Sequence, residues 1–166
     1  MLWLRGANIF EGYYKETDQT TAVLQEGWYK TGDVGRFDED GFLFIEGRMS
    51  RFSKIAGEMV PHLTVEQKIV EALDLHPAHG EGPAVAVVGV PDEKRGESLV
   101  LLTTATVVQV ELRQRLTAMG LPNLWIPKVV KQVAVIPIMA TGKLDLRACH
   151  RLAVQNGADT ETTVTS

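Results

Sequence analysis

Two apolar runs, AVAVVGV (residues 84–90) and ESLVLLTTA (residues 97–105), decide the fold class of this chain of 166 residues. Neither run alternates polar with apolar residues throughout, and nearly continuous apolar runs are typical of strands that are buried on both faces. The Pro91-Asp92 pair that follows the first run indicates its end. We therefore predict two buried strands in a small sheet that is covered by helices.

The segments around these strands predict three helices and a third strand. The helical segments are PHLTVEQKIVEALDL (61–75), QVELRQRLTAMG (109–120) and LDLRACHRLAV (144–154), and the strand is VVKQVAVI (129–136). In the first helix Pro61 suits the first turn. Apolar residues at helical spacing predict its buried face: Leu63, Ile69, Val70 and Leu73. From Gly47 on, the order is hairpin, helix, strand, strand, helix, strand, helix, and it predicts an α+β domain in which helices cover a three-stranded sheet.

Residues 1–47 have a different pattern, which consists of short strands and turns. DEDG (38–41) is a strong hairpin signal, and the one short helix predicted here would have Thr17 or Asp18 as its cap. No helix in this part is long enough to cover a core. We therefore predict that 1–47 is the β-rich end of a larger N-terminal domain, that 48–153 is a separate small domain, and that 154–166 is a disordered tail.

The composition excludes several classes of protein. A net charge of −4 argues against a general nucleic-acid binder. A single cysteine, Cys149, excludes an internal disulfide and suits a reducing compartment. The longest apolar run is far shorter than the roughly 20 residues of a membrane span, and no secretory signal is visible. His76 and His79 lack cysteine partners, so we predict no metal site.

The segment PIMATGKLD (137–145) looks at first like a phosphate-binding loop. A Walker A loop, however, has glycine where this chain has Pro137, and it has serine or threonine where Leu144 follows Lys143. The segment therefore lacks both the ring of backbone N–H groups and the hydroxyl that binds magnesium. If Lys143 is functional, we expect it to act as a single charge on a mobile loop.

Three motifs together carry a resemblance to a known family. YKTGD (29–33), GRMSRFSKIAGE (47–58) and PIMATGK (137–143), in this order and at these separations, resemble the last three core motifs of the adenylate-forming (ANL) enzymes. Within that superfamily, further segments look most like the acyl-carrier-protein synthetase region of the bifunctional 2-acylglycerophosphoethanolamine acyltransferases. These segments are RGANIFEGYY (5–14), RFSKIAGEMV (51–60), RGESLVLLTT (95–104), GLPNLWIPK (120–128) and IPIMATGKLD (136–145).

The resemblance implies the C-terminal lid domain of a larger ATP-dependent ligase. Such a ligase converts a fatty acid to an acyl-adenylate and passes the acyl group to the thiol of acyl carrier protein, here in lysophospholipid re-acylation. It implies ATP with Mg²⁺, bound mainly by a large domain upstream of residue 1, so we expect this chain alone to bind ATP weakly and not to turn over. It also implies a cytoplasmic location, or the inner face of a bacterial inner membrane through the parent protein.

The resemblance assigns roles to five residues. Asp33 matches the aspartate that binds the ribose hydroxyls, and Arg48 matches an arginine that contacts the nucleotide. Lys143 matches the catalytic lysine, which contacts the carboxylate and the α-phosphate. Ser50 stands at the hinge between domains, where many relatives have aspartate or lysine. Gly57 matches the loop that lines the thiol tunnel in the second step.

Two other interpretations stay open at this stage. The domain could be the lid of a long-chain acyl-CoA synthetase, which has the same chemistry with coenzyme A as the thiol. It could also be a non-catalytic module that docks carrier proteins. Arg48, Arg51 and Lys54 form a local basic patch that could steer an acidic carrier protein, although an ordinary solvated face explains the same charges.

Overall fold

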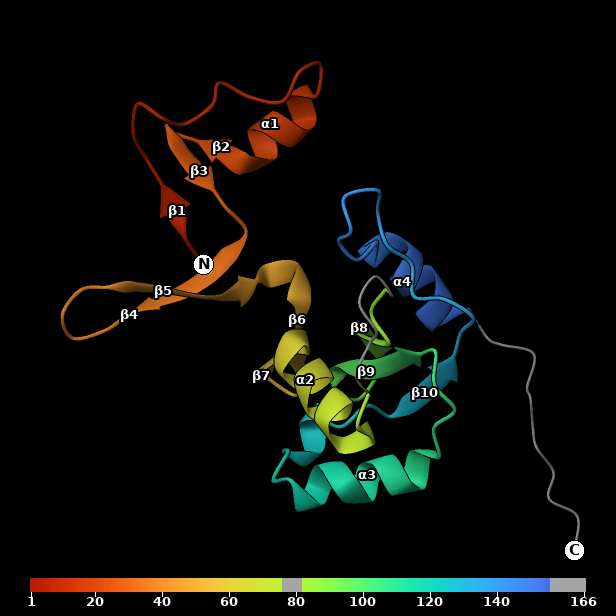
Figure 1. Cartoon of the computed structure of the whole chain (residues 1–166). Helices are drawn as coiled ribbons and strands as arrows, with labels where there is room; N and C mark the ends of the chain where they lie inside the picture. Colours follow the sequence, from red (N-terminus) through yellow and green to blue (C-terminus); the bar gives the residue numbers. More distant parts are fainter. Residues whose placement is uncertain (76–81, 156–166) are drawn as a thin grey trace, which may run out of the picture. The chain divides into compact units, whose positions relative to one another are not determined.

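The computed structural model describes residues 1–75 and 82–155, and the chain divides into two compact units, Met1–Arg51 and Phe52–Ser166 (Figure 1). The second unit contains both hydrophobic cores of the described residues. His76 and His79, at which no metal site was predicted, lie outside the described residues, as does the predicted tail from 156 onward.

The second unit is built on the three predicted strands, which are confirmed, although the third ends at Gln132 and not at Ile136. β8 (Val85–Asp92) and β9 (Gly96–Thr103) form an antiparallel hairpin that is paired along its whole length, and β10 (Val129–Gln132) pairs parallel to β9. A second hairpin, β6 (Phe52–Ile55) and β7 (Glu58–Pro61), joins the sheet at its edge. The sheet therefore has five strands and not the three predicted.

The hairpin predicted before the first helix is present as β6–β7, but the predicted three-stranded sheet left it out because its strands are short and half polar. It meets β9 through one residue pair, Ile55 with Gly96, and through a backbone hydrogen bond of 2.8 Å from Ala56 to Arg95. Its tight turn places Ala56 and Gly57 at positive φ, 50° and 90°. Docking on β9 is thus a tertiary contact that the local sequence does not predict.

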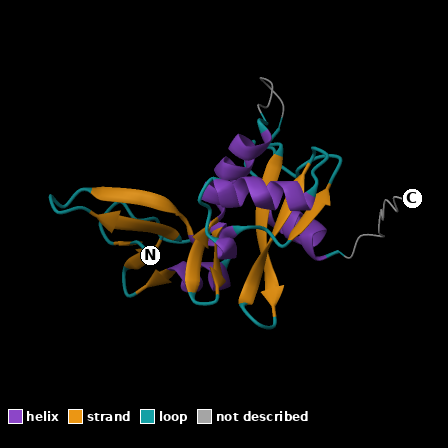
Figure 2. Ribbon diagram, turned by 90° about the horizontal axis from the view of Figure 1, so that it is seen from below, coloured by secondary structure: helices purple, strands orange, loops and turns teal. Residues whose placement is uncertain are grey.

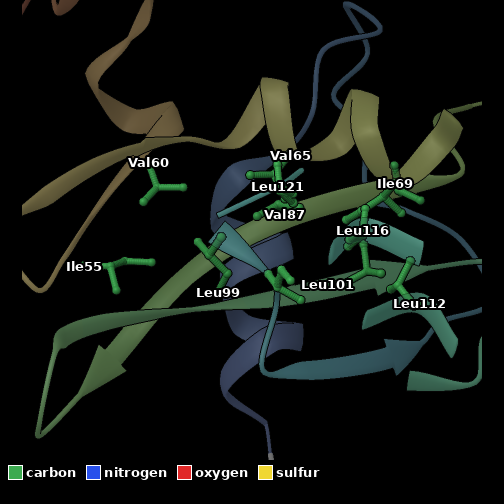
Figure 3. Packing of buried hydrophobic residues seen from close by; sticks show 12 residues of the cluster. Ile55, Val60, Val65, Ile69, Val87, Leu99, Leu101, Leu112, Leu116 and Leu121 are labelled. Carbon is green, nitrogen blue, oxygen red and sulfur yellow. The ribbon is translucent and has the colours of Figure 1, made fainter. Parts of the chain in front are cut away.

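Helices cover both faces of this sheet (Figures 1 and 2). α2 (His62–Leu73) and α3 (Gln109–Ala118) pack on one face, where Val65, Ile69 and Leu112 meet strand residues such as Val87 and Leu101 (Figure 3). α4 (Leu146–Val154) packs on the other face through Cys149 and Ala153. Successive side chains of β8 enter opposite cores, which explains the continuous apolar run in the sequence.

The predicted buried face of α2 is partly wrong. Ile69 is buried, but Leu63 is 56% exposed and Val65 is fully buried in its place. The helix begins at His62, with Pro61 as its N-cap, so the i, i+4 pair Val65 and Ile69 faces the sheet. The position of the first helical residue, which depends on the preceding hairpin, sets this register.

The first unit consists of short elements without a core. β1 (Trp3–Leu4), β3 (Trp28–Lys30) and β2 (Leu24–Gln25) form one small sheet, and β4 (Asp33–Phe37) pairs with β5 (Leu43–Arg48). α1 (Thr17–Val23) follows Glu16, which makes no side-chain cap, so the predicted cap at Thr17 or Asp18 is wrong.

Two 3₁₀ helices, η1 (Met49–Arg51) and η2 (Asn123–Trp125), complete the described elements. None of the helices in 1–75 and 82–155 is long and apolar enough to cross a membrane.

No residue of 1–51 is buried, and this predicts that the first unit does not fold by itself. An isolated hairpin or small sheet without a covered apolar face is at best marginally stable in water. A peptide of residues 1–51 is therefore expected to unfold without a cooperative transition in urea, followed by circular dichroism. A polypeptide of residues 52–155, which has two cores, is expected to show one. A sigmoidal transition for the shorter peptide would contradict this expectation.

A buried polar contact joins the two hairpins of the second unit to α2. The Ser53 hydroxyl and the His62 Nε2 atom lie 2.9 Å apart, and both residues are buried. Nearby, the Val87 backbone N–H donates to Glu66 Oε1 at 2.7 Å. Gly89 lies so close that a Cβ atom there would come within 1.9 Å of the Ser53 hydroxyl. These contacts tie β6, α2 and β8 together.

Gly89→Ala is therefore expected to destabilise the second unit by about 1–3 kcal/mol, the usual cost of overpacking a filled interior. Urea unfolding of the 166-residue chain measures this loss. The Ser53→Ala/Gly89→Ala variant should be less destabilised than the sum of the two single variants, because the Ser53 oxygen causes the closest clash. An alanine variant at Gly89 with unchanged midpoint would show that the backbone there has room to move.

Candidate functional site

Two of the predicted nucleotide ligands, Asp33 and Arg48, lie directly opposite each other in the β4–β5 ladder. The Arg48 Nε–H donates to Asp33 Oδ1 at 2.9 Å. The Asp33 side chain is only 26% exposed, whereas that of Arg48 is 68% exposed. Within the part of the chain that the structure describes, the second carboxylate oxygen of Asp33 accepts no hydrogen bond. The pair therefore offers an ionised acceptor that is already oriented by its arginine.

The turn that carries Asp33 is held from two sides. Gly32 adopts a φ of 76°, which glycine accepts without strain, and the Asp33 N–H donates to the Thr31 hydroxyl at 3.0 Å. The Leu2 N–H donates to the Asp33 carbonyl at 2.8 Å, and the Met49 N–H donates to the Gly32 carbonyl at 2.7 Å. These contacts come from both ends of the unit and hold the backbone of the turn that carries the carboxylate.

An aromatic cluster lies beside this pair. The Phe10 ring meets the rings of Tyr13 and Tyr29 edge to face, each with a centroid distance of 5.1 Å. Burial raises the pKa of Tyr29, and a hydrogen bond with Tyr13 raises it further. Arg48 and Asp33 also act on the Tyr29 phenol electrostatically, in opposite directions. Tyr29 therefore stays neutral at physiological pH.

The predicted hinge and thiol-loop residues lie in two different local settings. Ser50 is the central residue of η1, one residue before the first unit ends at Arg51. Gly57 lies in the β6–β7 turn, and a Cβ atom there would meet nothing within 4 Å. In this chain, glycine is thus required at 57 by its positive φ and not by crowding. The two proposed roles stay predictions.

Lys143 lies on a hydrogen-bonded hairpin. Ile138 bridges to Leu144, the Met139 N–H donates to the Lys143 carbonyl at 2.7 Å, and the Gly142 N–H donates to the Met139 carbonyl at 2.8 Å. Gly142 has a φ of 80°, as the last position of a three-residue hairpin loop requires. The Lys143 side chain is exposed, and its ammonium has no ion-pair partner in residues 1–75 or 82–155.

The residues of the basic patch predicted from the sequence belong to both units. Arg48 pairs with Asp33, Arg51 ends the first unit and Lys54 lies in the second. Among the described residues, no group of three or more histidine, cysteine or acidic side chains is arranged to hold a metal ion. Carrier-protein steering by this patch stays a prediction.

One residue near Lys143 has a role that was not predicted from the sequence. Asp145 is the N-cap of α4, and its side chain accepts a hydrogen bond of 2.9 Å from the Ala148 N–H. The signal was present, because an aspartate directly before an amphipathic segment is a typical helix start. The predicted helix began at Leu144 and therefore placed Asp145 inside the helix.

Known proteins resemble this chain in sequence and in fold. Residues 65–143 match the family model of the AMP-binding enzyme C-terminal domain. A protein named "Probable CoA ligase" from Humulus lupulus is 35% identical over 155 residues, which is 90% of this chain and 28% of that protein. A long-chain-fatty-acid–CoA ligase from Yersinia pestis is 32% identical over 145 residues, which is 86% of this chain and 25% of the relative.

A solved structure gives the same result. The o-succinylbenzoate CoA synthetase of Bacillus subtilis, in complex with its acyl-adenylate intermediate, superposes with a TM-score of 0.67 at 28% identity. The superposition covers 89% of this chain and 29% of that chain. This chain thus spans between about a quarter and three tenths of the length of these proteins. Residues 65–143 thus belong, on the α+β fold predicted from the sequence, to the C-terminal domain of the AMP-binding, adenylate-forming (ANL) superfamily.

Proposed function

We propose that this chain is part of an AMP-forming ligase that activates a carboxylic acid with ATP and then transfers the acyl group to a thiol. The observation that carries the proposal is the contact between Asp33 and Arg48. These residues come from two separate motifs, 15 positions apart, and the resemblance assigns each of them to the nucleotide. In this proposal, the two motifs lie together because both bind the same nucleotide.

In the proposed site, Asp33 accepts hydrogen bonds from the ribose hydroxyls of ATP. The Arg48 guanidinium holds that carboxylate by one N–H and keeps further donors for the nucleotide. The described residues fit the ribose hydroxyls, since the second carboxylate oxygen of Asp33 accepts no hydrogen bond from any of them. They hold no cluster that suits Mg²⁺, so we place the Mg²⁺ ligands in polypeptide outside 1–75 and 82–155.

Lys143 supplies the catalytic charge in this proposal. In the first step a carboxylate oxygen of the acid attacks the α-phosphorus of ATP, and the bond to pyrophosphate breaks. Negative charge grows on the phosphoryl oxygens, and an ammonium beside them lowers the barrier. In the second step a thiol attacks the acyl carbon and AMP leaves. Ser50 would serve as the hinge between the domains, which allows them to rearrange between the two steps. Gly57 would leave room for the thiol arm.

The finer assignment concerns the acid and the acceptor. We propose a fatty acid as the substrate and acyl carrier protein as the acceptor, in lysophospholipid re-acylation. The motif similarities described above support it, and a long-chain-fatty-acid–CoA ligase is among the relatives. Coenzyme A is the competing acceptor, because the relatives carry coenzyme A in their names.

Pyrophosphate exchange tests the proposal. The protein from the complete reading frame is incubated with ATP, labelled pyrophosphate and either palmitate or an aromatic acid. We expect exchange that depends on the fatty acid, and its absence with every acid would contradict the ligase. Product analysis with holo acyl carrier protein or coenzyme A then separates the acceptors. For the 166-residue chain alone, we expect no ATP binding in the micromolar range by calorimetry.

A further inference from the structure

We infer that Asp145 is a positioning residue that holds the Lys143 hairpin on the helix α4. The inference rests on the catalytic role proposed for Lys143. The Lys143 side chain is exposed and has no ion-pair partner in the described residues, so its position depends on the hairpin that carries it. Asp145, two residues further along the chain, holds this hairpin.

Asp145 makes three hydrogen bonds in two directions. Its backbone N–H donates across the base of the hairpin to the Pro137 carbonyl at 3.0 Å. Its carboxylate accepts from the Ala148 N–H at 2.9 Å, and its carbonyl accepts from the Cys149 N–H at 2.9 Å. One residue therefore closes the hairpin and starts the helix.

The helix in turn is anchored in the core. Cys149 is completely buried among Ala86, Val100 and Leu102, and its thiol lies 3.8 Å from the same Pro137 carbonyl that Asp145 binds. A continuous set of contacts thus runs from the sheet through α4 and Asp145 to Pro137, at the start of the hairpin's first strand. Lys143 lies in the second strand of that hairpin.

The far end of α4 is also capped by a side chain. The Lys131 ammonium, on β10, donates to the carbonyls of Leu152, Ala153 and Gln155 at 3.3, 2.7 and 2.5 Å. A helix of nine residues is too short to be stable by its own hydrogen bonds, so such caps matter. With both ends held, α4 can act as a fixed base for the hairpin.

Asp145 could instead act through its charge, which lies close in sequence to the Lys143 ammonium. Substitutions separate the two explanations. Asparagine keeps the oxygen that caps the helix but removes the charge, whereas alanine removes both. A positioning role predicts that Asp145→Asn behaves like the native protein and that Asp145→Ala does not. A charge role predicts that both variants fail alike.

The first experiment is hydrogen exchange on the 166-residue chain. In Asp145→Ala we expect the amides of Met139, Gly142 and Asp145 to exchange about 2- to 30-fold faster, the range that loss of an N-cap supports. Asp145→Asn should stay within about twofold of the native rates. This readout does not depend on the activity of the complete protein.

The second experiment is pyrophosphate exchange by the complete protein. Asp145→Ala is expected to lower kcat by about 10- to 100-fold, since a misplacement near 1 Å of a catalytic group has effects of that size. The KM for ATP should stay within about twofold, and Asp145→Asn should restore kcat. Lys131→Met, which frees the far end of α4, should give a smaller loss than Asp145→Ala. Lys128→Met is its matched control, because Lys128 pairs with Asp92 and not with α4.

The outcomes are distinguishable. Equal losses in the alanine and asparagine variants, or native kcat in Asp145→Ala, would overturn the inference. If Asp145→Ala does not fold, the comparison of Lys131→Met with Lys128→Met decides, and equal kcat in those two would also overturn it. If Lys143→Ala keeps full activity, the proposed function fails, while hydrogen exchange still shows whether Asp145 holds the hairpin.

Discussion

Replacing Lys143 with alanine is expected to slow carboxylate activation by the complete protein by about 100- to 1,000-fold. The charge that develops on the phosphoryl oxygens in the transition state would lose its nearest cation. The hairpin itself should persist, because its hydrogen bonds are made by the backbones of Met139, Gly142 and Lys143. Pyrophosphate exchange at saturating ATP measures the loss in kcat.

Lys94→Ala is the matched control for this variant. Lys94 is also an exposed lysine at a hairpin turn, and its side chain has no partner in the described residues. It should leave kcat within about twofold, so a general effect of removing one positive charge is excluded. Native activation rates in Lys143→Ala would refute the catalytic role and, with it, the central part of the proposed mechanism.

Asp33→Ala is expected to raise the KM for ATP by about 10- to 100-fold. A hydrogen bond to a charged group contributes about 1.5–3 kcal/mol, and the variant removes the acceptor that Arg48 orients for the ribose. The loss should appear in KM more than in kcat, because the ribose lies away from the reacting phosphorus. Initial rates of pyrophosphate exchange over a range of ATP concentrations separate the two parameters.

Glu46→Gln provides the control for Asp33→Ala. Glu46 pairs with Arg36 at 3.2 Å in the same β4–β5 hairpin, so the variant also removes one acidic partner from an exposed ion pair. Such pairs contribute little to stability, and the KM for ATP should not change. If both variants raised KM alike, the effect would come from the hairpin and not from the carboxylate of Asp33.

The prediction of the sheet succeeded where the sequence pattern is local. The runs at 84–90 and 97–105 are apolar because each strand enters two cores, and the turn between them lies in a short polar stretch. The prediction gave a hairpin after Gly47 but not the place of β6 and β7 in the sheet, which depends on one pairing with β9. It failed for Leu63 because the register of α2 is set by where the preceding hairpin ends.

The site shows the same division. The α+β class, the central strands and the three motifs can be predicted from the sequence, because hydrophobic runs and motif spacing are properties of the linear chain. Three contacts appear only in the folded protein: Asp33 touches Arg48, Asp145 closes the Lys143 hairpin, and Lys131 caps α4. These contacts join residues through strand register and through packing on a shared core. Their free energy depends on distances of a few ångströms, which no linear pattern of residues records.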